Sequence, residues 1–217
     1  KANLRVIFPD QSDHQLRKIS RRVFRNFAKY LVDFFRFEKI NLQFINKNIK
    51  LENLRYFDEA LARGKGVVVL TAHLGNWELG GVVLAQLGYP FWAVALPHKN
   101  KKVNDFFDAQ RSRKGIKVVA MGKAVRSCIT EIRNKHMVAL VGDRDFTQGG
   151  VVVNFFGRLA MIPRGPAAFS LKSNCPIVAG FTTMEGNDKY RLFFNPAILF
   201  KASGEYEKDI IRLTEMY

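Results

Sequence analysis

The chain has 217 residues, of which 47% are hydrophobic, and a formal net charge of +16. This length and composition suit a single domain with one substantial core. Two cysteines, Cys128 and Cys175, are too few for a disulfide scaffold and lack the Cys/His spacing of a structural metal site, so we expect buried free thiols and no metal. No apolar run approaches the roughly 18 residues that a membrane span requires. The chain starts at Lys1 and stops inside the helical pattern "DIIRLTEMY", so we expect a fragment of a longer chain.

The positive charge predicts an anionic partner, which could be nucleic acid, an acidic membrane surface or a phosphorylated substrate. Half of the excess lies in residues 1–50, which hold 12 Lys and Arg against 4 Asp and Glu. Within that region, the segment 14–37 has the period of an amphipathic helix. Its apolar stripe is formed by Ile19, Val23, Phe27, Leu31 and Phe34, and its opposite face by Arg17, Lys18, Arg21, Arg22, Arg25, Lys29 and Arg36.

A basic, aromatic-rich amphipathic helix of this kind is typical of a membrane surface. A helix packed on its own domain with a solvated charged face has the same pattern. Both interpretations stay open at this point, and the two can hold together.

The elements that follow alternate between helical and strand patterns. We expect a helix over 51–66 that ends at Gly64 and Gly66, then strands over 67–72, 91–96, 116–121 and 136–142, separated by helices over 76–88, 101–115 and 123–135. Residues 151–199 mix further strands with one helix. Such βαβ units predict an α/β fold with a mainly parallel central sheet flanked by helices. We divide the chain into a basic helical region, 1–50, and an α/β domain, 51–217.

The segment "TAHLGNWELGG" (71–81) follows directly on the first expected strand. His73 lies at the carboxyl end of that strand, the edge at which parallel sheets bind ligands. Glu78 falls in the first turn of the next helix, and the corner between them can bring it within hydrogen-bond reach of His73. A carboxylate that holds one imidazole nitrogen makes the other a general base. The alternative is a structural corner, with a capping His and a surface Glu.

Neighbouring residues of the same segment fit this corner. Asn76 suits the N-cap position of the helix. Gly75, Gly80 and Gly81 leave room for the close approach of a substrate.

The segment "LTAHLGNWELGG" resembles the H-x4-[DE] block of the lysophospholipid acyltransferase superfamily, in particular the lipid A biosynthesis (lauroyl/myristoyl) acyltransferase family. The resemblance extends over roughly 17–213. Asn100, Arg111 and Gly115 are arranged as in the second block of the family, "VGDRDF" resembles its strand-ending acidic stretch, and "RGPAAFSLKSN" resembles its Gly-Pro helix.

The resemblance implies transfer of an acyl group from an acyl carrier protein or coenzyme A thioester to a hydroxyl of an anionic membrane glycolipid or phospholipid. No cofactor beyond that co-substrate is implied. His73 is the expected general base, and Glu78 is expected to orient it. The expected partners include the membrane surface, at the cytoplasmic face of the bacterial inner membrane, and exclude nucleic acid. The expected substrate-binding residues are Asn76, Asn100, Arg111, Asp143, Arg144 and Arg164.

Two other classes of function compete with this interpretation. The stretch "VALVGDRDFT" matches the nucleophile motif of haloacid dehalogenase phosphatases, with Asp143 as nucleophile and Asp145 as acid/base, although that motif normally lies on the first strand of its domain. The net charge also suits a nucleic-acid-binding protein, but no helix-turn-helix, zinc-finger or RNP pattern supports one.

Overall fold

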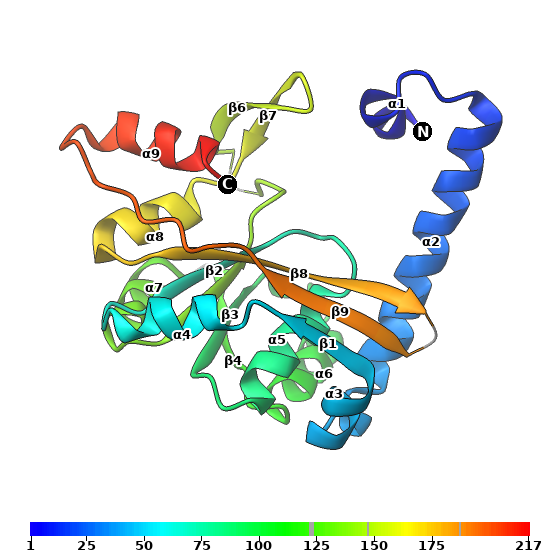
Figure 1. Cartoon of the computed structure of the whole chain (residues 1–217), viewed down its shortest axis with the longest axis horizontal. Helices are drawn as coiled ribbons and strands as arrows, with labels where there is room; N and C mark the ends of the chain where they lie inside the picture. The colour runs from blue at the N-terminus through cyan, green and yellow to red at the C-terminus, as the bar shows by residue number, and fades with distance from the viewer. Residues whose placement is uncertain (122–123, 147, 187) are drawn as a thin grey trace.

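A mostly parallel seven-stranded sheet forms the centre of the computed structural model, which describes residues 1–121, 124–146, 148–186 and 188–217 (Figure 1). Its strands are β1 (Ile49–Glu52), β2 (Val67–Thr71), β3 (Phe91–Ala95), β4 (Lys117–Ala120), β5 (Met137–Val141), β8 (Ile177–Gly186) and β9 (Lys189–Phe194). They lie in the order β1-β9-β8-β2-β5-β3-β4, and every neighbouring pair is parallel except β8 with β9. The predicted α/β class is confirmed.

Helices cover both faces of this sheet, and a separate antiparallel hairpin stands apart from it (Figure 1). The hairpin consists of β6 (Val151–Phe155) and β7 (Arg158–Ile162). The helices are α1 (Ala2–Ile7), α2 (Asp13–Phe35), the 3-10 turn η1 (Phe37–Lys39), α3 (Leu42–Asn48), α4 (Arg55–Ala62), α5 (Trp77–Gln86), α6 (Lys101–Ser112), α7 (Ala124–Arg133), α8 (Gly165–Ser173) and α9 (Tyr206–Glu215).

The continuous apolar run of β2 reflects burial on both faces of the sheet. Val67 and Val69 join the core cluster with α4 and α5, whereas Val68 and Leu70 join the cluster on the opposite face with α7, α8 and α9. Both cysteines lie in this second cluster as buried free thiols, as predicted.

The chain around residue 50 differs from the expected helix over 51–66. Ile49–Glu52 instead form the edge strand β1, which pairs with β9 in parallel, and α4 begins only at Arg55. The partner of β1, β9, is 141 positions away in sequence, as the pairing of Ile49 with Tyr190 shows, so the local pattern could not reveal it. The division of the chain at residue 50 stays a prediction.

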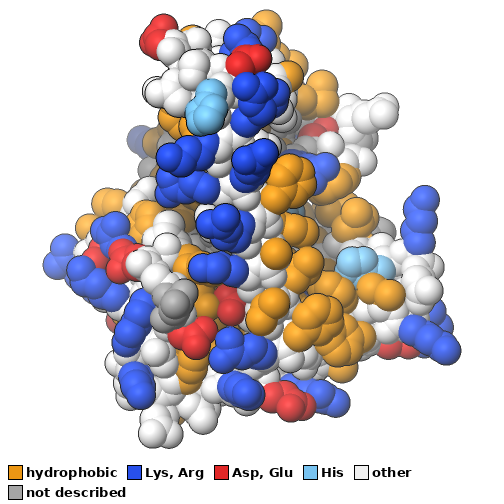
Figure 2. All heavy atoms as spheres, turned by 90° about the vertical axis from the view of Figure 1, so that its right-hand side faces the viewer, with side chains coloured by type: hydrophobic (Ala, Val, Ile, Leu, Met, Phe, Trp, Pro, Cys, Tyr) orange, Lys and Arg blue, Asp and Glu red, His pale blue; other side chains and the backbone are white. Residues whose placement is uncertain are grey.

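Helix α2 is packed on the domain only at its C-terminal end. Phe34 of the predicted stripe and the nearby Tyr30 are 0% and 6% exposed, whereas Val23 and Phe27 of that stripe are 54% and 51% exposed. The N-terminal part of the helix projects beyond the sheet (Figure 1), and Figure 2 shows bands of Lys and Arg running beside hydrophobic side chains on the face that α2 covers. No helix in the described part of the chain is long and apolar enough to cross a bilayer.

The corner between β2 and α5 requires glycine at position 75. Gly75 has φ of +63°, and its backbone lies so close to β8 that an added Cβ would come within 1.9 Å of the Thr182 carbonyl oxygen. The Asn76 amide then donates to that same oxygen at 2.9 Å. Gly80 likewise faces the Thr182 hydroxyl, and Gly81 faces Phe91. At Gly75 the space is occupied by the backbone of β8, so the prediction that this glycine makes room for a substrate is wrong, whereas Gly80 and Gly81 line a small cavity between α5 and the sheet.

We expect Gly75→Ala to destabilise the fold strongly. Gly64 is the matched control, because its φ is +68° and an added Cβ would meet no atom within 4 Å. Gly64→Ala should cost roughly 1 kcal/mol for the left-handed backbone alone. Gly75→Ala adds the clash with Thr182 and should cost on the order of 2–4 kcal/mol. Urea unfolding of the two variants checks this, and equal losses would contradict the proposed close approach.

Candidate active site

The ends of β2 and β5 bring two polar side chains together. The strands are adjacent, parallel and in register, with Thr71 opposite Val141. His73 and Asp143 each lie two residues beyond that last pair, so they meet at the carboxyl edge of the sheet. The His73 ring nitrogen Nδ1 lies 2.7 Å from Asp143 Oδ1, and the His73 amide donates to Asp143 Oδ2 at 3.1 Å.

This double contact fixes the orientation of the imidazole. A carboxylate only accepts hydrogen bonds, so Nδ1 carries the proton and Nε2 presents its lone pair. Partial burial acts to raise the pKa of Asp143, but the hydrogen bond from the His73 ring, its charge and its amide outweigh burial and lower that pKa. Because the folded-state pKa lies below the unfolded one, ionised Asp143 stabilises the fold at neutral pH. That contribution is lost as the pH falls through the lowered value.

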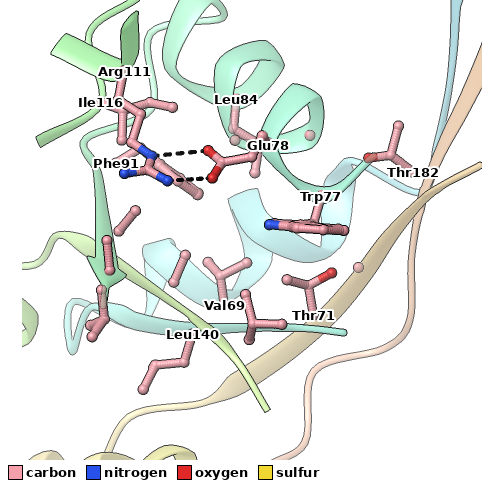
Figure 3. Close-up of a pocket in the computed structure, with 18 of the residues that line it drawn as sticks. Val69, Thr71, Trp77, Glu78, Leu84, Phe91, Arg111, Ile116, Leu140 and Thr182 are labelled. Carbon is pink, nitrogen blue, oxygen red and sulfur yellow. Dashed lines mark hydrogen bonds and ion pairs between the residues drawn. The ribbon is translucent and has the colours of Figure 1, made fainter. Parts of the chain in front are cut away.

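Glu78 does not contact His73, which corrects the expected pairing. It lies in the first turn of α5 and turns to the other side of the corner, where Arg111 of α6 holds both of its carboxylate oxygens (Figure 3). Arg111 Nε lies 3.1 Å from Oε2, and Nη2 lies 2.5 Å from Oε1. The two side chains are only 12% and 10% exposed. Burial acts to lower the pKa of Arg111, but the Glu78 carboxylate outweighs it and raises that pKa.

The pair borders a small cavity of about 80 Å³ between α5 and the sheet (Figure 3). Its other walls are largely apolar and include Val69, Leu84 and Phe91. The expected substrate-binding role of Arg111 does not fit this position, because its nitrogens are taken by Glu78 and, at 3.4 Å, Asp108.

Asn76 ties the corner to α2 and is buried rather than open to a substrate. Its Oδ1 accepts the Leu79 amide at 3.0 Å and so caps α5, as predicted. Its Nδ2 donates to Asp33 Oδ2 of α2 at 3.0 Å, and the Tyr190 hydroxyl donates to the same oxygen at 2.7 Å. With 1% exposure, Asn76 is a structural residue of the corner, which corrects its expected substrate-binding role.

An aromatic contact reinforces this link. Tyr30 of α2 stacks on Trp77, with ring centroids 4.5 Å apart, and Trp77 meets the His73 ring edge-on at 4.8 Å. The C-terminal end of α2 therefore supports the His73 corner through one polar and one aromatic contact.

A cavity of about 500 Å³ opens beside His73. Leu96, Pro97 and Phe169 contribute apolar walls, and Arg144 and Arg164 also line it. Arg144 lies over the Phe146 ring at 5.2 Å, and Arg164 donates to Glu207 at 2.7 Å. Both arginines therefore line the same cavity as His73, and their substrate-binding role stays a prediction.

Asn100 and the phosphatase motif are placed differently from their expected roles. Asn100 caps α6, where its side chain accepts the amides of Lys102 and Val103, and it does not line the cavity beside His73. Asp143 is bonded to His73, and Asp145 accepts the Gly150 amide at 2.9 Å. Thr147 of the motif lies outside the described residues. Those residues contain no cluster of three or more His, Cys, Asp or Glu able to hold a metal.

From the sequence, Asp143 is a predicted substrate-binding residue and, in the alternative interpretation, a phosphatase nucleophile, but not the partner of His73. The available signal was that His73 and Asp143 follow their strands at the same distance. Recognising it requires knowing that β2 and β5 are neighbours, which βαβ alternation alone leaves open, because β3 and β4 lie between them in sequence.

We expect Glu78→Gln to lower stability by about 3–5 kcal/mol, because it leaves the Arg111 charge buried without its partner. Glu52→Gln is the matched control: Glu52 also binds an arginine, Arg191, at 2.6–2.8 Å, but the arginine side chain is 41% exposed. The control should lose under about 1 kcal/mol. Denaturant unfolding of both variants measures the difference, and a small loss for Glu78→Gln would argue against a structural role of the buried pair.

Comparison with known proteins agrees with the resemblance of the sequence. The family model described as "Bacterial lipid A biosynthesis acyltransferase" matches residues 1–216. A phosphatidylinositol mannoside acyltransferase of Mycobacterium tuberculosis (strain ATCC 25618 / H37Rv) is 29% identical over 167 residues, which are 74% of this chain and 53% of that protein. A lipid A biosynthesis acyltransferase of Haemophilus influenzae is 22% identical over 200 residues, 91% of this chain and 63% of that protein.

The chain thus spans between about half and two thirds of the length of these relatives. The family match covers nearly all of it, including the strand-end pair of His73 and Asp143. The chain belongs to the bacterial lipid A biosynthesis acyltransferase family.

Proposed function

We propose that this chain carries the catalytic site of an O-acyltransferase that moves a fatty acyl group from a thioester to a hydroxyl of a membrane lipid. The observation that carries the proposal is the 2.7 Å contact of His73 with Asp143 beside a cavity of about 500 Å³. It joins an oriented base to a space for substrates. The names of the relatives support the reaction class, but two different lipid acceptors appear among them.

The reaction needs one proton acceptor and no covalent acyl-enzyme. His73 Nε2 takes the proton of the acceptor hydroxyl as the oxygen attacks the thioester carbonyl carbon. The tetrahedral intermediate then collapses, the C–S bond breaks, and the imidazolium returns the proton to the leaving thiolate. Asp143 holds the ring through Nδ1 and stabilises the imidazolium between these two steps.

The donor is a thioester of acyl carrier protein or coenzyme A. Both carry a phosphopantetheine group, and Arg144 and Arg164 at the cavity offer positive charge for its phosphate or for that of an anionic acceptor. Both donors are cytoplasmic molecules, so we place the reaction at the cytoplasmic face of the bacterial inner membrane.

Helix α2 is the proposed contact with that membrane. Residues 21–29 are all exposed, and they combine Arg21, Arg22 and Arg25 with Phe24 and Phe27. Positive charge beside exposed aromatic rings suits an anionic lipid surface. The buried C-terminal end of the same helix supports the His73 corner, so the site lies close to the proposed contact.

We expect His73→Ala to abolish transfer while the protein stays folded. General-base catalysis contributes roughly 10²–10⁴-fold, so the loss in kcat should fall in that range. Asp143→Asn should lower kcat by less than His73→Ala, because the ring keeps its base but loses the carboxylate that holds Nδ1 and stabilises the imidazolium. Labelled acyl carrier protein and coenzyme A thioesters with a bacterial lipid extract provide the assay.

Glu78→Gln is the control for Asp143→Asn, since Glu78 touches Arg111 and not the imidazole. The kcat of its folded fraction should stay close to the wild-type value whatever happens to its stability. Full transfer by folded His73→Ala would overturn the proposed reaction, and an unchanged kcat in Asp143→Asn would remove Asp143 from the mechanism.

Neutralising Arg21, Arg22 and Arg25 together should weaken binding to anionic vesicles. Each basic residue near such a surface contributes about 1 kcal/mol, so the triple Gln variant should bind on the order of 100-fold more weakly at low salt. The control neutralises Arg63, Lys65 and Arg133, which are exposed at the amino edge of the sheet and change the net charge equally. Vesicle sedimentation measures both, and equal losses would mean that net charge alone drives binding.

A further inference from the structure

The hairpin β6–β7 has one buried and one exposed apolar face. In the register of the two strands, Val152 lies opposite Met161 and Asn154 lies opposite Leu159. Val151, Val153 and Ile162 point the other way and are buried with α9 at 8%, 7% and 9% exposure. The hairpin outer face, defined here as Val152, Phe156, Leu159 and Met161, is 53%, 59%, 80% and 48% exposed.

The turn of the hairpin places a large aromatic residue where its backbone is strained. Phe156 and Gly157 connect the strands with φ of +53° and +74°. Two such values are typical of a type I′ turn, which favours Asn or Asp followed by Gly. A bulky residue with positive φ is uncommon and costs stability. Phe156 recovers little of that cost by burial, since it contacts Phe155 edge-on at 4.6 Å but stays 59% exposed.

The hairpin is also joined directly to the cavity beside His73. Gly150, at the start of β6, donates its amide to Asp145, which lines that cavity. Pro163 and Arg164 follow β7 immediately and line the same cavity. In Figure 1 the hairpin projects from the same side of the sheet as the N-terminal part of α2.

Charge identifies the kind of partner that suits this surface. Arg158 is the only charged residue in 151–162, and Arg144 and Arg164 flank the base of the hairpin. An apolar face with a phenylalanine and a leucine at its end, on a segment (151–162) that carries one basic and no acidic residue, matches the interface of an anionic bilayer.

We propose that the hairpin outer face inserts into the lipid surface as a second membrane contact beside α2. The inference rests on the proposed function, because it supplies the route by which a membrane-embedded acceptor reaches His73. With contacts on two elements, the mouth of the cavity is turned toward the bilayer.

The first test places an environment-sensitive fluorophore on the outer face of the natural full-length chain. Leu159→Cys can be labelled selectively, because Cys128 and Cys175 are 0% and 5% exposed. The matched control is Asn134→Cys, an exposed neutral position at the amino edge of the sheet. With anionic phosphatidylglycerol-containing vesicles, emission at position 159 should shift to the blue and rise at least twofold, and lipids with brominated chains should quench it. Position 134 should not change.

Three results would overturn the proposal. Unchanged emission at position 159 in vesicle-bound protein would show that α2 binds without the hairpin. Blue emission without vesicles that depends on protein concentration would assign the face to a second copy of the chain. Blue emission without vesicles at every concentration would show that the protein itself covers the face. The same label in a His73→Ala background should insert equally, so the result is independent of the proposed chemistry.

The second test uses the strain at Phe156. Phe156→Asn should raise the midpoint of urea unfolding, because Asn suits the turn, and should also lower the vesicle-bound fraction at least threefold. A merely structural residue would not move stability and membrane binding in opposite directions. Unchanged vesicle binding by this variant would contradict the proposal.

Discussion

The in-register pairing of β2 with β5 determines the chemistry of the site. Thr71 and Val141 end the two strands level with each other. His73 and Asp143 each lie two residues further on, so they meet although 70 positions separate them. A shift of this register by one residue would turn the side chains of one strand to the opposite face. Because β2 packs into a separate core cluster on each face of the sheet, such a shift would force both clusters to repack, so the packing of the core and the orientation of the imidazole are linked.

Local pattern was sufficient to predict the α/β class and the place of His73, because strand burial, helix capping and the strand end are all encoded within a few residues. It failed for the partner of His73. Glu78 was the nearest carboxylate in sequence, but it lies in the first turn of α5 and is directed to Arg111, which holds both of its carboxylate oxygens. To predict Asp143 as the partner of His73, one must know that the strands lie in the order β2, β5, β3. That order depends on contacts between distant parts of the chain.

The same limit applies to α2. Its period correctly predicted an apolar stripe, but a period cannot tell what covers that stripe. Apart from Leu16 near its start, α2 is buried only at its C-terminal end, where Asp33 accepts hydrogen bonds from Asn76 and Tyr190. Burial acts to raise the pKa of Asp33, and these hydrogen bonds only partly offset it, so the net shift is upward. The burial of Asp33 therefore costs free energy. Its hydrogen bonds, however, connect α2 to the corner that carries His73 with more directional control than a purely apolar contact would give.

The interior of the molecule pairs nearly all of its polar groups, whereas its surface leaves large apolar side chains exposed. Among the described residues, Ser173 Oγ is the only buried side-chain polar atom without a hydrogen-bond partner, so the core leaves almost nothing unsatisfied. The surface, in contrast, exposes Phe24 at 73% and Leu159 at 80%, on two elements that project from the same side of the sheet (Figure 1). Because the buried polar groups are already paired, the exposed side chains of Phe24 and Leu159 add nothing to the stability of the fold. Their cost is best explained by a partner that is apolar inside and anionic outside, which is the structure of the membrane in which the proposed acceptor resides.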